Sequence, residues 1–122
     1  MFYNLRLVYI TTKNREEAKN IGSVLVEEKL AACVNIIDGM ETIYRWKGKI
    51  ETGKECILIA KTGYGKVEVL TKRVKELHSY EVPCVISLKV AEQEGNIEYL
   101  EWLIGSVRNP KAMTHQSEGH DS

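Results

Sequence analysis

The stretch METIYRWKGKIETGKECILIAKT, residues 40–62, contains two extended segments with only a short polar region between them. Residues 40–46 carry β-branched and aromatic side chains, and residues 54–62 alternate two apolar sets of side chains. Residues 47–54 are rich in glycine and charge, so they are predicted to form the tip of a β-hairpin. No helix separates these two strands, which predicts an antiparallel pair at the centre of the chain.

Upstream of this hairpin, the pattern predicts one strand and one amphipathic helix. Residues 5–12 form a β-branched apolar run typical of a strand. A helix is predicted to begin after Asn14, a favourable N-cap residue, and to end near Lys29. Residues 31–37 start the next strand, which is predicted to enter the hairpin through a bulge at residues 38–39.

Downstream of the hairpin, the same pair of elements is predicted in the same order. Apolar residues at helical spacing follow Gly65, and this helix is predicted to end at His78. Pro83 then favours extended chain. Residues 85–91 are predicted to form a fourth strand, and residues 97–107 a short terminal helix.

The resulting order, β-α-β-β-α-β plus a terminal helix, predicts an α+β, ferredoxin-like sandwich. In this arrangement four antiparallel strands carry both helices on one face. The strands are apolar on both faces, so the second face needs a covering layer. We therefore expect subunits to associate through this face and the long hairpin. Residues 1–108 are predicted to form this domain, and the polar, aperiodic residues 109–122 a disordered tail.

Composition excludes several classes of function. Lysine plus arginine number 17, as do aspartate plus glutamate, so binding to nucleic acid through a basic surface is not expected. No apolar run approaches the roughly 20 residues that span a bilayer, so no membrane association is expected. The three cysteines are odd in number and widely spaced, which is typical of reduced thiols in a cytoplasmic protein.

The segment HSYEVPCV, residues 78–85, holds several side chains that could carry chemistry. It could be a metal site, part of an active site, or the turn between a helix and a strand. His78 and Cys84 offer an imidazole and a thiolate, which suit a soft cation such as Cu(I). Cys33 is the third candidate metal ligand, although a small thiol in an apolar strand can also pack as alanine does. Further ligands would have to come from another segment or subunit.

A second group of residues predicts a cleft for a small ligand. Lys61 ends an otherwise apolar strand, where it could bind an anion or only extend its ammonium group into water. Trp46 could form a wall of this cleft or anchor an interface, and Tyr80 and Glu55 complete the predicted lining. The sequence has no Gly-x-Gly-x-x-Gly, Cys-x-x-Cys or His-Glu-x-x-His motif, and we expect no enzyme activity.

Five separated segments together resemble the CutA divalent-cation-tolerance family. They are LAACVNI (30–36), YRWKGKIE (44–51), IAKT (59–62), HSYEVPCV (78–85) and GNIEYLEWL (95–103). The resemblance extends over residues 5 to 107. It implies a ferredoxin-like subunit in a tight homotrimer, similar to the PII signalling proteins, with strands paired across subunits.

The resemblance also implies a role without stating a reaction. Members are associated with tolerance of copper and other divalent cations. The family usually reads His-Pro-Tyr-x-x-Pro-Glu where this chain has Ser79 and Cys84. Some members carry a thiol and a second histidine that are linked to copper. This chain has Ile10 and Leu77 at those positions, so its candidate ligands there are His78 and Cys84. Two functions follow: response to copper or another divalent cation, or PII-like sensing of a small molecule without metal.

Overall fold

Four strands form one antiparallel sheet in the order β2-β3-β1-β4. The computed structural model describes residues 4–108, so the predicted tail at residues 109–122 lies outside the described residues. The strands are β1 (Leu5–Thr12), β2 (Cys33–Trp46), β3 (Lys49–Gly63) and β4 (Val85–Lys89). The helices are α1 (Arg15–Glu27), the 3-10 turn η1 (Tyr64–Lys66), α2 (Val67–Leu77) and α3 (Ile97–Val107). The predicted α+β, ferredoxin-like arrangement is confirmed.

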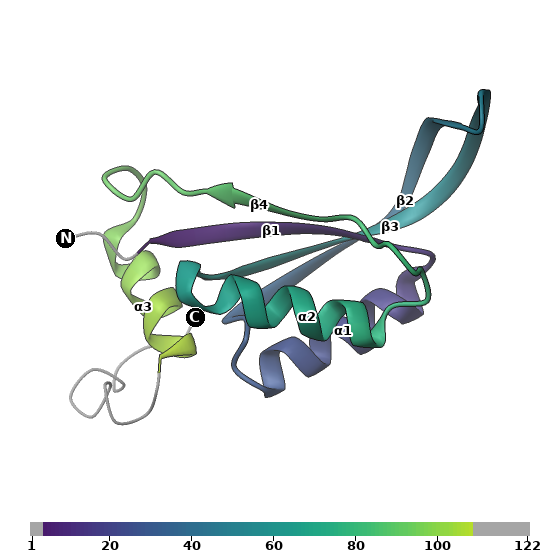
Figure 1. The fold of residues 1–122 in the computed structure, drawn as a ribbon. Coiled ribbons are helices and arrows are strands. Elements are labelled where there is room, and N and C mark those ends of the chain that lie inside the picture. Colours follow the sequence, from purple (N-terminus) through teal and green to yellow (C-terminus); the bar gives the residue numbers. More distant parts are fainter. Residues whose placement is uncertain (1–3, 109–122) are drawn as a thin grey trace.

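Helices α1 and α2 lie on one face of the sheet, and α3 packs at one end of it (Figure 1). Side-chain hydrogen bonds at the start of α1 explain where this helix begins. The Asn14 side chain accepts a hydrogen bond from the Glu17 N–H at 2.9 Å, and Glu17 accepts one from the Lys13 N–H at 2.9 Å. The Asn14 cap is the one that the sequence predicts, while the Glu17 carboxylate reaches one residue farther back, to Lys13. The helix ends at Glu27, two residues before the predicted end. None of the helices within residues 4–108 is long and apolar enough to cross a membrane.

The hairpin differs from its prediction. Residues 47–54 were expected to form its tip, but β3 begins at Lys49 and only Lys47 and Gly48 form the turn. Their φ angles of 50° and 79° fit a two-residue hairpin turn with both central residues left-handed. The polar residues that suggested a long tip instead continue the ladder, because both faces of this hairpin are exposed. The predicted bulge is confirmed by a register shift between Ile37 and Met40.

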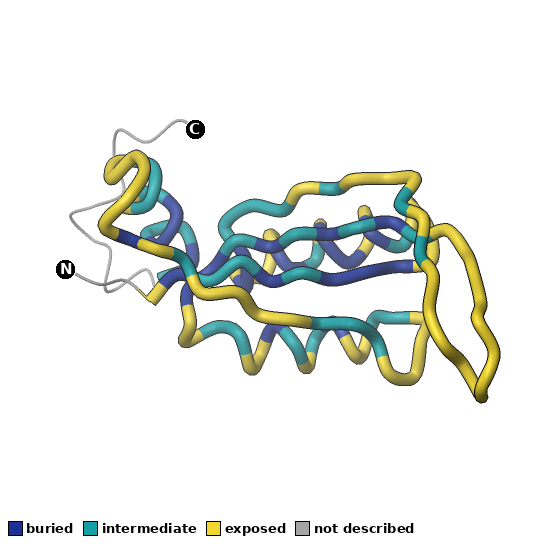
Figure 2. Tube along the Cα trace, turned by 90° about the horizontal axis from the view of Figure 1, so that it is seen from above, coloured by how far each residue is buried: buried dark blue, intermediate teal, exposed yellow. Residues whose placement is uncertain are grey.

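Apolar side chains between the sheet and helices α1 and α2 form the main core. Its largest fully buried members are Val8, Ile10, Ile21, Leu25, Leu58, Leu70 and Val74. A smaller cluster packs α3 against the start of β1 through Leu5, Leu103, Ile104 and Val107. Figure 2 shows burial concentrated along β1 and the adjacent part of β3, while the hairpin is exposed. The main core therefore lies on the side of the sheet that α1 and α2 cover.

The opposite side of the sheet, here called the bare face, is covered by neither α1 nor α2 (Figure 1). Helix α3 reaches it at one end, where Tyr99 contacts Lys61. Strand register places its apolar residues side by side on neighbouring strands: Leu7, Tyr9, Ile37, Ile57, Ile59, Ile86 and Leu88. Ile86 is 53% exposed and Leu88 is 50% exposed. The hairpin rises from this side and also exposes Ile43 and Ile50. This surface fits the expectation that a further layer covers the sheet.

Candidate ligand site at the base of the hairpin

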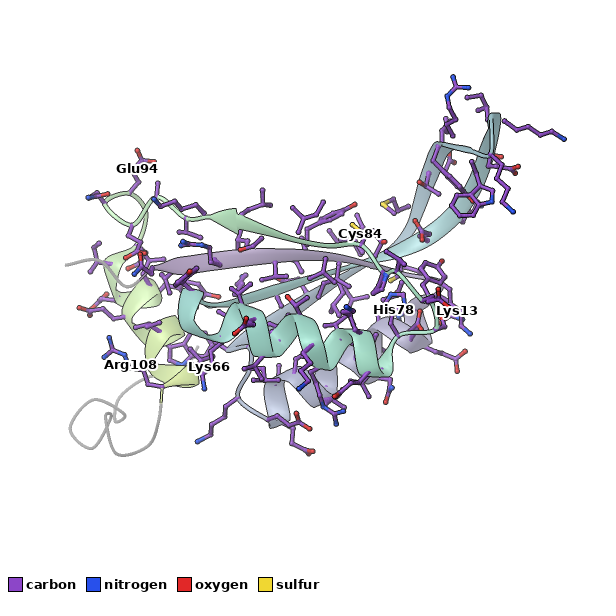
Figure 3. The ribbon with its side chains drawn as sticks, viewed as in Figure 1. Lys13, Lys66, His78, Cys84, Glu94 and Arg108 are labelled. Carbon is purple, nitrogen blue, oxygen red and sulfur yellow. The ribbon has the colours of Figure 1, made fainter. Side chains whose placement is uncertain are left out.

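A hollow of about 510 Å³ lies where the hairpin leaves the sheet, beside the segment that joins α2 to β4. Its lining residues are Thr11, Thr42, Tyr44, Trp46, Gly53, Lys54, Glu55, Tyr80, Val82 and Cys84. Figure 3 places Cys84 on the joining segment, just below the rising hairpin. Three of the four predicted cleft residues, Trp46, Glu55 and Tyr80, therefore lie around one hollow.

The strand register explains how the hairpin supplies its part of the lining. Tyr44, Trp46 and Glu55 all fall on one face of the hairpin, because cross-strand partners share a face and faces alternate along each strand. Gly53 pairs with Thr42 on this same face and contributes no side chain. The missing side chain leaves room between the aromatic rings and the carboxylate. Tyr44 could have been predicted from its two-residue spacing to Trp46.

The joining segment reaches the hairpin through one hydrogen bond. The Tyr80 hydroxyl donates to Oε2 of Glu55 at 3.0 Å. Partial burial of the phenol and this bond to a carboxylate together raise the pKa of Tyr80 from 10 to about 12. Tyr80 is therefore a neutral hydrogen-bond donor at physiological pH, and Glu55 is its acceptor.

Replacing Glu55 by glutamine is expected to lower the pKa of Tyr80 from about 12 toward the ordinary value of 10. The amide oxygen still accepts the hydrogen bond, but no negative charge then opposes ionisation of the phenol. Titration of ¹³C-labelled tyrosine by NMR measures this pKa, and Tyr80→Phe identifies the signal. An unchanged pKa in Glu55→Gln would show that burial alone sets it.

His78 holds the joining segment in place from below the hollow. Its side chain is 0% exposed. Nε2 lies 2.8 Å from the carbonyl oxygen of Thr11, and Nδ1 lies 3.0 Å from the backbone nitrogen of Tyr80. A carbonyl only accepts and an N–H only donates, so the neutral ring with its proton on Nε2 satisfies both partners. Both ring nitrogens are thus engaged within the chain.

Glu17 ties the same segment to the start of α1. Its Oε2 accepts a hydrogen bond from the Ser79 N–H at 2.7 Å and lies 3.9 Å from Nδ1 of His78. Burial raises the pKa of Glu17, but the hydrogen bonds that its carboxylate accepts from Lys13 and Ser79 outweigh this and leave the pKa below its ordinary value. We call His78 and Glu17 the corner clasp, because together they fix the turn that carries Tyr80.

The structure does not bring the three predicted metal ligands together. Cys33 pairs with Lys61 on β3, six residues from Glu55, which corresponds to about 20 Å along a strand. Cys84 lines the hollow, while both nitrogens of His78 are bonded elsewhere. Within residues 4–108, no three His, Cys, Asp or Glu side chains are grouped so that they could hold a metal ion.

Lys61 also lies away from the hollow, although the sequence placed it in the predicted cleft. Its Nζ is 3.1 Å from the Tyr99 hydroxyl and 5.3 Å from the centre of that ring. Tyr99 belongs to α3, at the far end of β3 from Glu55. Sequence reasoning recognised that Lys61 ends an apolar strand but not that the terminal helix supplies its partner. The cation expected to attract an anion is therefore absent from the lining.

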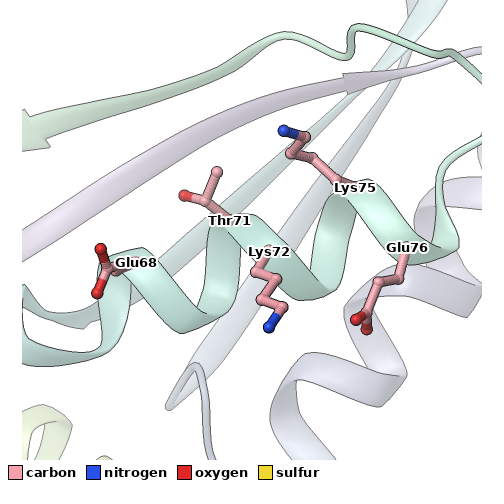
Figure 4. Close-up of a pocket in the computed structure, with 5 residues that line it drawn as sticks. All are labelled: Glu68, Thr71, Lys72, Lys75 and Glu76. Carbon is pink, nitrogen blue, oxygen red and sulfur yellow. The ribbon is translucent and has the colours of Figure 1, made fainter.

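A second hollow lies over α2 and has a different character (Figure 4). It is lined by Glu68, Thr71, Lys72, Lys75 and Glu76. All five residues lie on one helix at spacings typical of a solvated face, where opposite charges follow each other. Lys72 and Glu76 point to one side of the helix, and Thr71 and Lys75 to the other. No aromatic ring lines this surface, which makes it a useful comparison for the hairpin hollow.

Comparison with known proteins agrees with this architecture. The family described as CutA1 divalent ion tolerance protein matches residues 6–106. Protein CutA 1, chloroplastic, from Oryza sativa subsp. japonica is 46% identical over 102 residues, which cover 84% of this chain and 56% of that protein. Divalent-cation tolerance protein CutA from Thermus thermophilus is 47% identical over 97 residues, or 80% of this chain and 92% of that one.

The solved structure of the divalent cation tolerance protein (Cut A1) from Thermus thermophilus superimposes with a TM-score of 0.81 at 44% identity. The match covers 85% of this chain and 99% of that one. This chain thus spans little more than half the length of the rice relative and nearly all of the bacterial one. On the match over residues 6–106 and these identities, the chain belongs to the CutA1 divalent ion tolerance protein family.

Proposed function

We propose that this protein acts in tolerance of divalent cations, and that the hollow at the hairpin base is where it binds one. The observation that carries this proposal is that Cys84 and Glu55 line the same hollow. A thiolate and a carboxylate suit copper or another borderline divalent cation. Two side chains do not complete a coordination shell, so the proposal needs further ligands from a neighbouring subunit or from water.

The same proposal makes the working unit a cytoplasmic homotrimer. The apolar bare face, the projecting hairpin and the two outer strands of the sheet, β2 and β4, all support association between subunits. A hairpin that reaches a neighbouring subunit would bring that subunit's side chains close to the hollow. The free thiols of Cys33, Cys56 and Cys84 support a reducing compartment such as the cytoplasm.

Replacing Cys84 by serine is expected to weaken Cu(I) binding by at least about tenfold. Loss of an outer-shell partner already costs about 10- to 100-fold in metal affinity, and loss of a direct ligand costs no less. Anaerobic competition against a chromogenic Cu(I) chelator measures this affinity. Cys33→Ser is the matched control, because this thiol lies at the other end of the sheet. Equal affinity in Cys84→Ser and the wild type would remove the hollow as a copper site.

The aromatic lining favours a second candidate function, recognition of a small molecule. Tyr44, Trp46 and Tyr80 supply three rings around a hollow that also offers a few polar groups. Ligand sites are commonly built in this way. The candidate is tested by saturable binding of a small ligand to protein from which metal has been removed by a chelator. It does not depend on Cys84 as a ligand.

A further inference from the structure

We infer that the small molecule recognised by this hollow is an organic cation that carries an alkylammonium or guanidinium group. The inference rests on the second candidate function and names the ligand class of the same hollow. Three features support it: the arrangement of the rings, the sign of the charge in the lining, and the room that Gly53 leaves. Each of them can be changed separately by mutation.

The rings come from two segments that face the hollow from different directions. Tyr44 and Trp46 lie on one face of the hairpin, while Tyr80 lies on the segment between α2 and β4. In the single chain their exposed fractions are 48%, 59% and 38%, so residues of the chain itself leave part of each side chain uncovered. Aromatic faces attract cations, and Nζ of Lys47 already lies 5.8 Å from the centre of the Trp46 ring. The hairpin itself therefore shows that this ring accepts an ammonium group.

The charged residues of the hollow favour a cation over an anion. Glu55 lies on the same hairpin face as the two hairpin rings. Lys54 is the basic residue in the lining, but alternation puts it on the other face, where its cross-strand partner is Glu41. Farther toward the tip, Glu51 and Lys49 share the face of Glu55 and offset each other in charge. Lys13 and Arg15 line a separate hollow with Glu55 and are not part of the lining around the rings, so an anion beside the rings would meet the Glu55 carboxylate.

The size of the hollow favours an organic ligand over a bare metal ion. A volume of about 510 Å³ lies within the range typical of small-molecule sites. Gly53 keeps this space open, because a Cβ atom there would lie 3.7 Å from the Thr42 methyl group and a longer side chain would enter the hollow. The ring faces offer a metal ion no lone-pair donor, whereas the methylene groups of an organic cation can pack against them.

The test compares three probes of equal length: n-butylammonium, 1-butanol and butyrate. The chain contains two tryptophans, so Trp102→Phe leaves Trp46 as the single tryptophan of the full-length, metal-free protein. Its fluorescence then reports on the hollow. We expect n-butylammonium to change Trp46 fluorescence saturably and to bind at least about tenfold more tightly than the alcohol or the carboxylate. Equal affinity for the alcohol, or tighter binding of butyrate, would overturn the inference.

Two variants locate this binding. Glu55→Gln is expected to weaken n-butylammonium about tenfold or more, since it removes a charge-assisted contact. Glu68→Gln, in the hollow over α2, is the matched control and should leave binding unchanged (Figure 4). Gly53→Leu should fill the hollow and abolish binding, because the backbone there is not left-handed and tolerates a side chain. Binding that survives in Gly53→Leu with the wild-type oligomeric mass would overturn the inference.

The Cys84→Ser variant separates this inference from the proposed cation tolerance. It should lose Cu(I) affinity and retain n-butylammonium binding, because the Cys84 side chain supplies no aromatic ring and serine keeps its small size. Wild-type protein that binds n-butylammonium but no divalent cation would contradict the metal function alone. Wild-type protein that binds copper through Cys84 but shows no preference for n-butylammonium would contradict the organic-cation inference alone.

Discussion

Replacing Ile86 by aspartate is expected to prevent the proposed association through the bare face and to leave monomers at micromolar concentration. Ile86 lies on the bare face and is 53% exposed in the single chain, so the isolated subunit should tolerate the change. In an assembly that covers this face, the carboxylate would be buried without a partner. This costs about 3 kcal/mol or more per subunit, which weakens association by more than a factor of about a hundred.

Val69→Asp is the matched control for this experiment. Val69 is also 53% exposed, but it lies in the first turn of α2 and not on the bare face of the sheet. An acidic side chain is favourable at the start of a helix. Analytical ultracentrifugation at several protein concentrations should give the wild-type mass for Val69→Asp and the mass of one chain for Ile86→Asp. A wild-type mass for both variants would show that the bare face is not the interface.

The fold could be predicted because its signals are local or periodic. The cap at Asn14, the helical spacing before His78 and the bulge near residues 38–39 each depend on a few neighbouring residues. The apolar side chains of both strand faces also indicated the bare face. The extent of the hairpin strands was predicted wrongly. Residues 49–54 are exposed on both faces of the hairpin, so they show no alternation of apolar and polar side chains, and their glycine and charge suggest a loop. An exposed ladder leaves little trace in hydrophobic pattern.

The site was harder to predict, because its members are brought together by register and by the bend of the hairpin. Trp46, Glu55 and Tyr80 were expected together and do meet. Lys61 was expected with them, but the sequence does not reveal that Tyr99 of α3 supplies its partner. The role of His78 was also hidden, since its partners are backbone groups, which every residue carries.

The positions of Lys61 and His78 together change which ligands the hollow can bind. Without Lys61, the hollow loses the charge that suggested an anion, and the charged group that contacts one of its rings directly is Glu55, through the Tyr80 hydroxyl. With both His78 nitrogens engaged, a metal would have to be held by Cys84, by Glu55 and by groups outside this chain. The three rings of Tyr44, Trp46 and Tyr80 line the hollow whatever the positions of Lys61 and His78. The geometry therefore gives an organic cation more contacts within one chain than it gives a metal ion.

Replacing His78 by alanine is expected to destabilise the protein by about 3 kcal/mol. The change leaves a cavity where a fully buried ring stood and removes the partners of the Thr11 carbonyl and the Tyr80 N–H. Urea unfolding at one fixed protein concentration measures the loss, since unfolding of an assembly depends on concentration. Tyr80→Phe is the matched control and should cost less than about 1 kcal/mol, because it removes one exposed hydrogen bond and keeps the backbone N–H.

Copper affinity in the same His78→Ala variant decides between the two roles of this residue. If His78 belongs to the corner clasp, the variant loses stability and, where it remains folded, binds Cu(I) with an affinity close to that of the wild type, because neither ring nitrogen faces a ligand. If His78 is a metal ligand, Cu(I) affinity falls by at least about tenfold while the metal-free protein unfolds near the wild-type urea concentration. That second outcome would require the ring to leave the Thr11 carbonyl and the Tyr80 N–H at little cost, and would overturn its assignment as a structural residue.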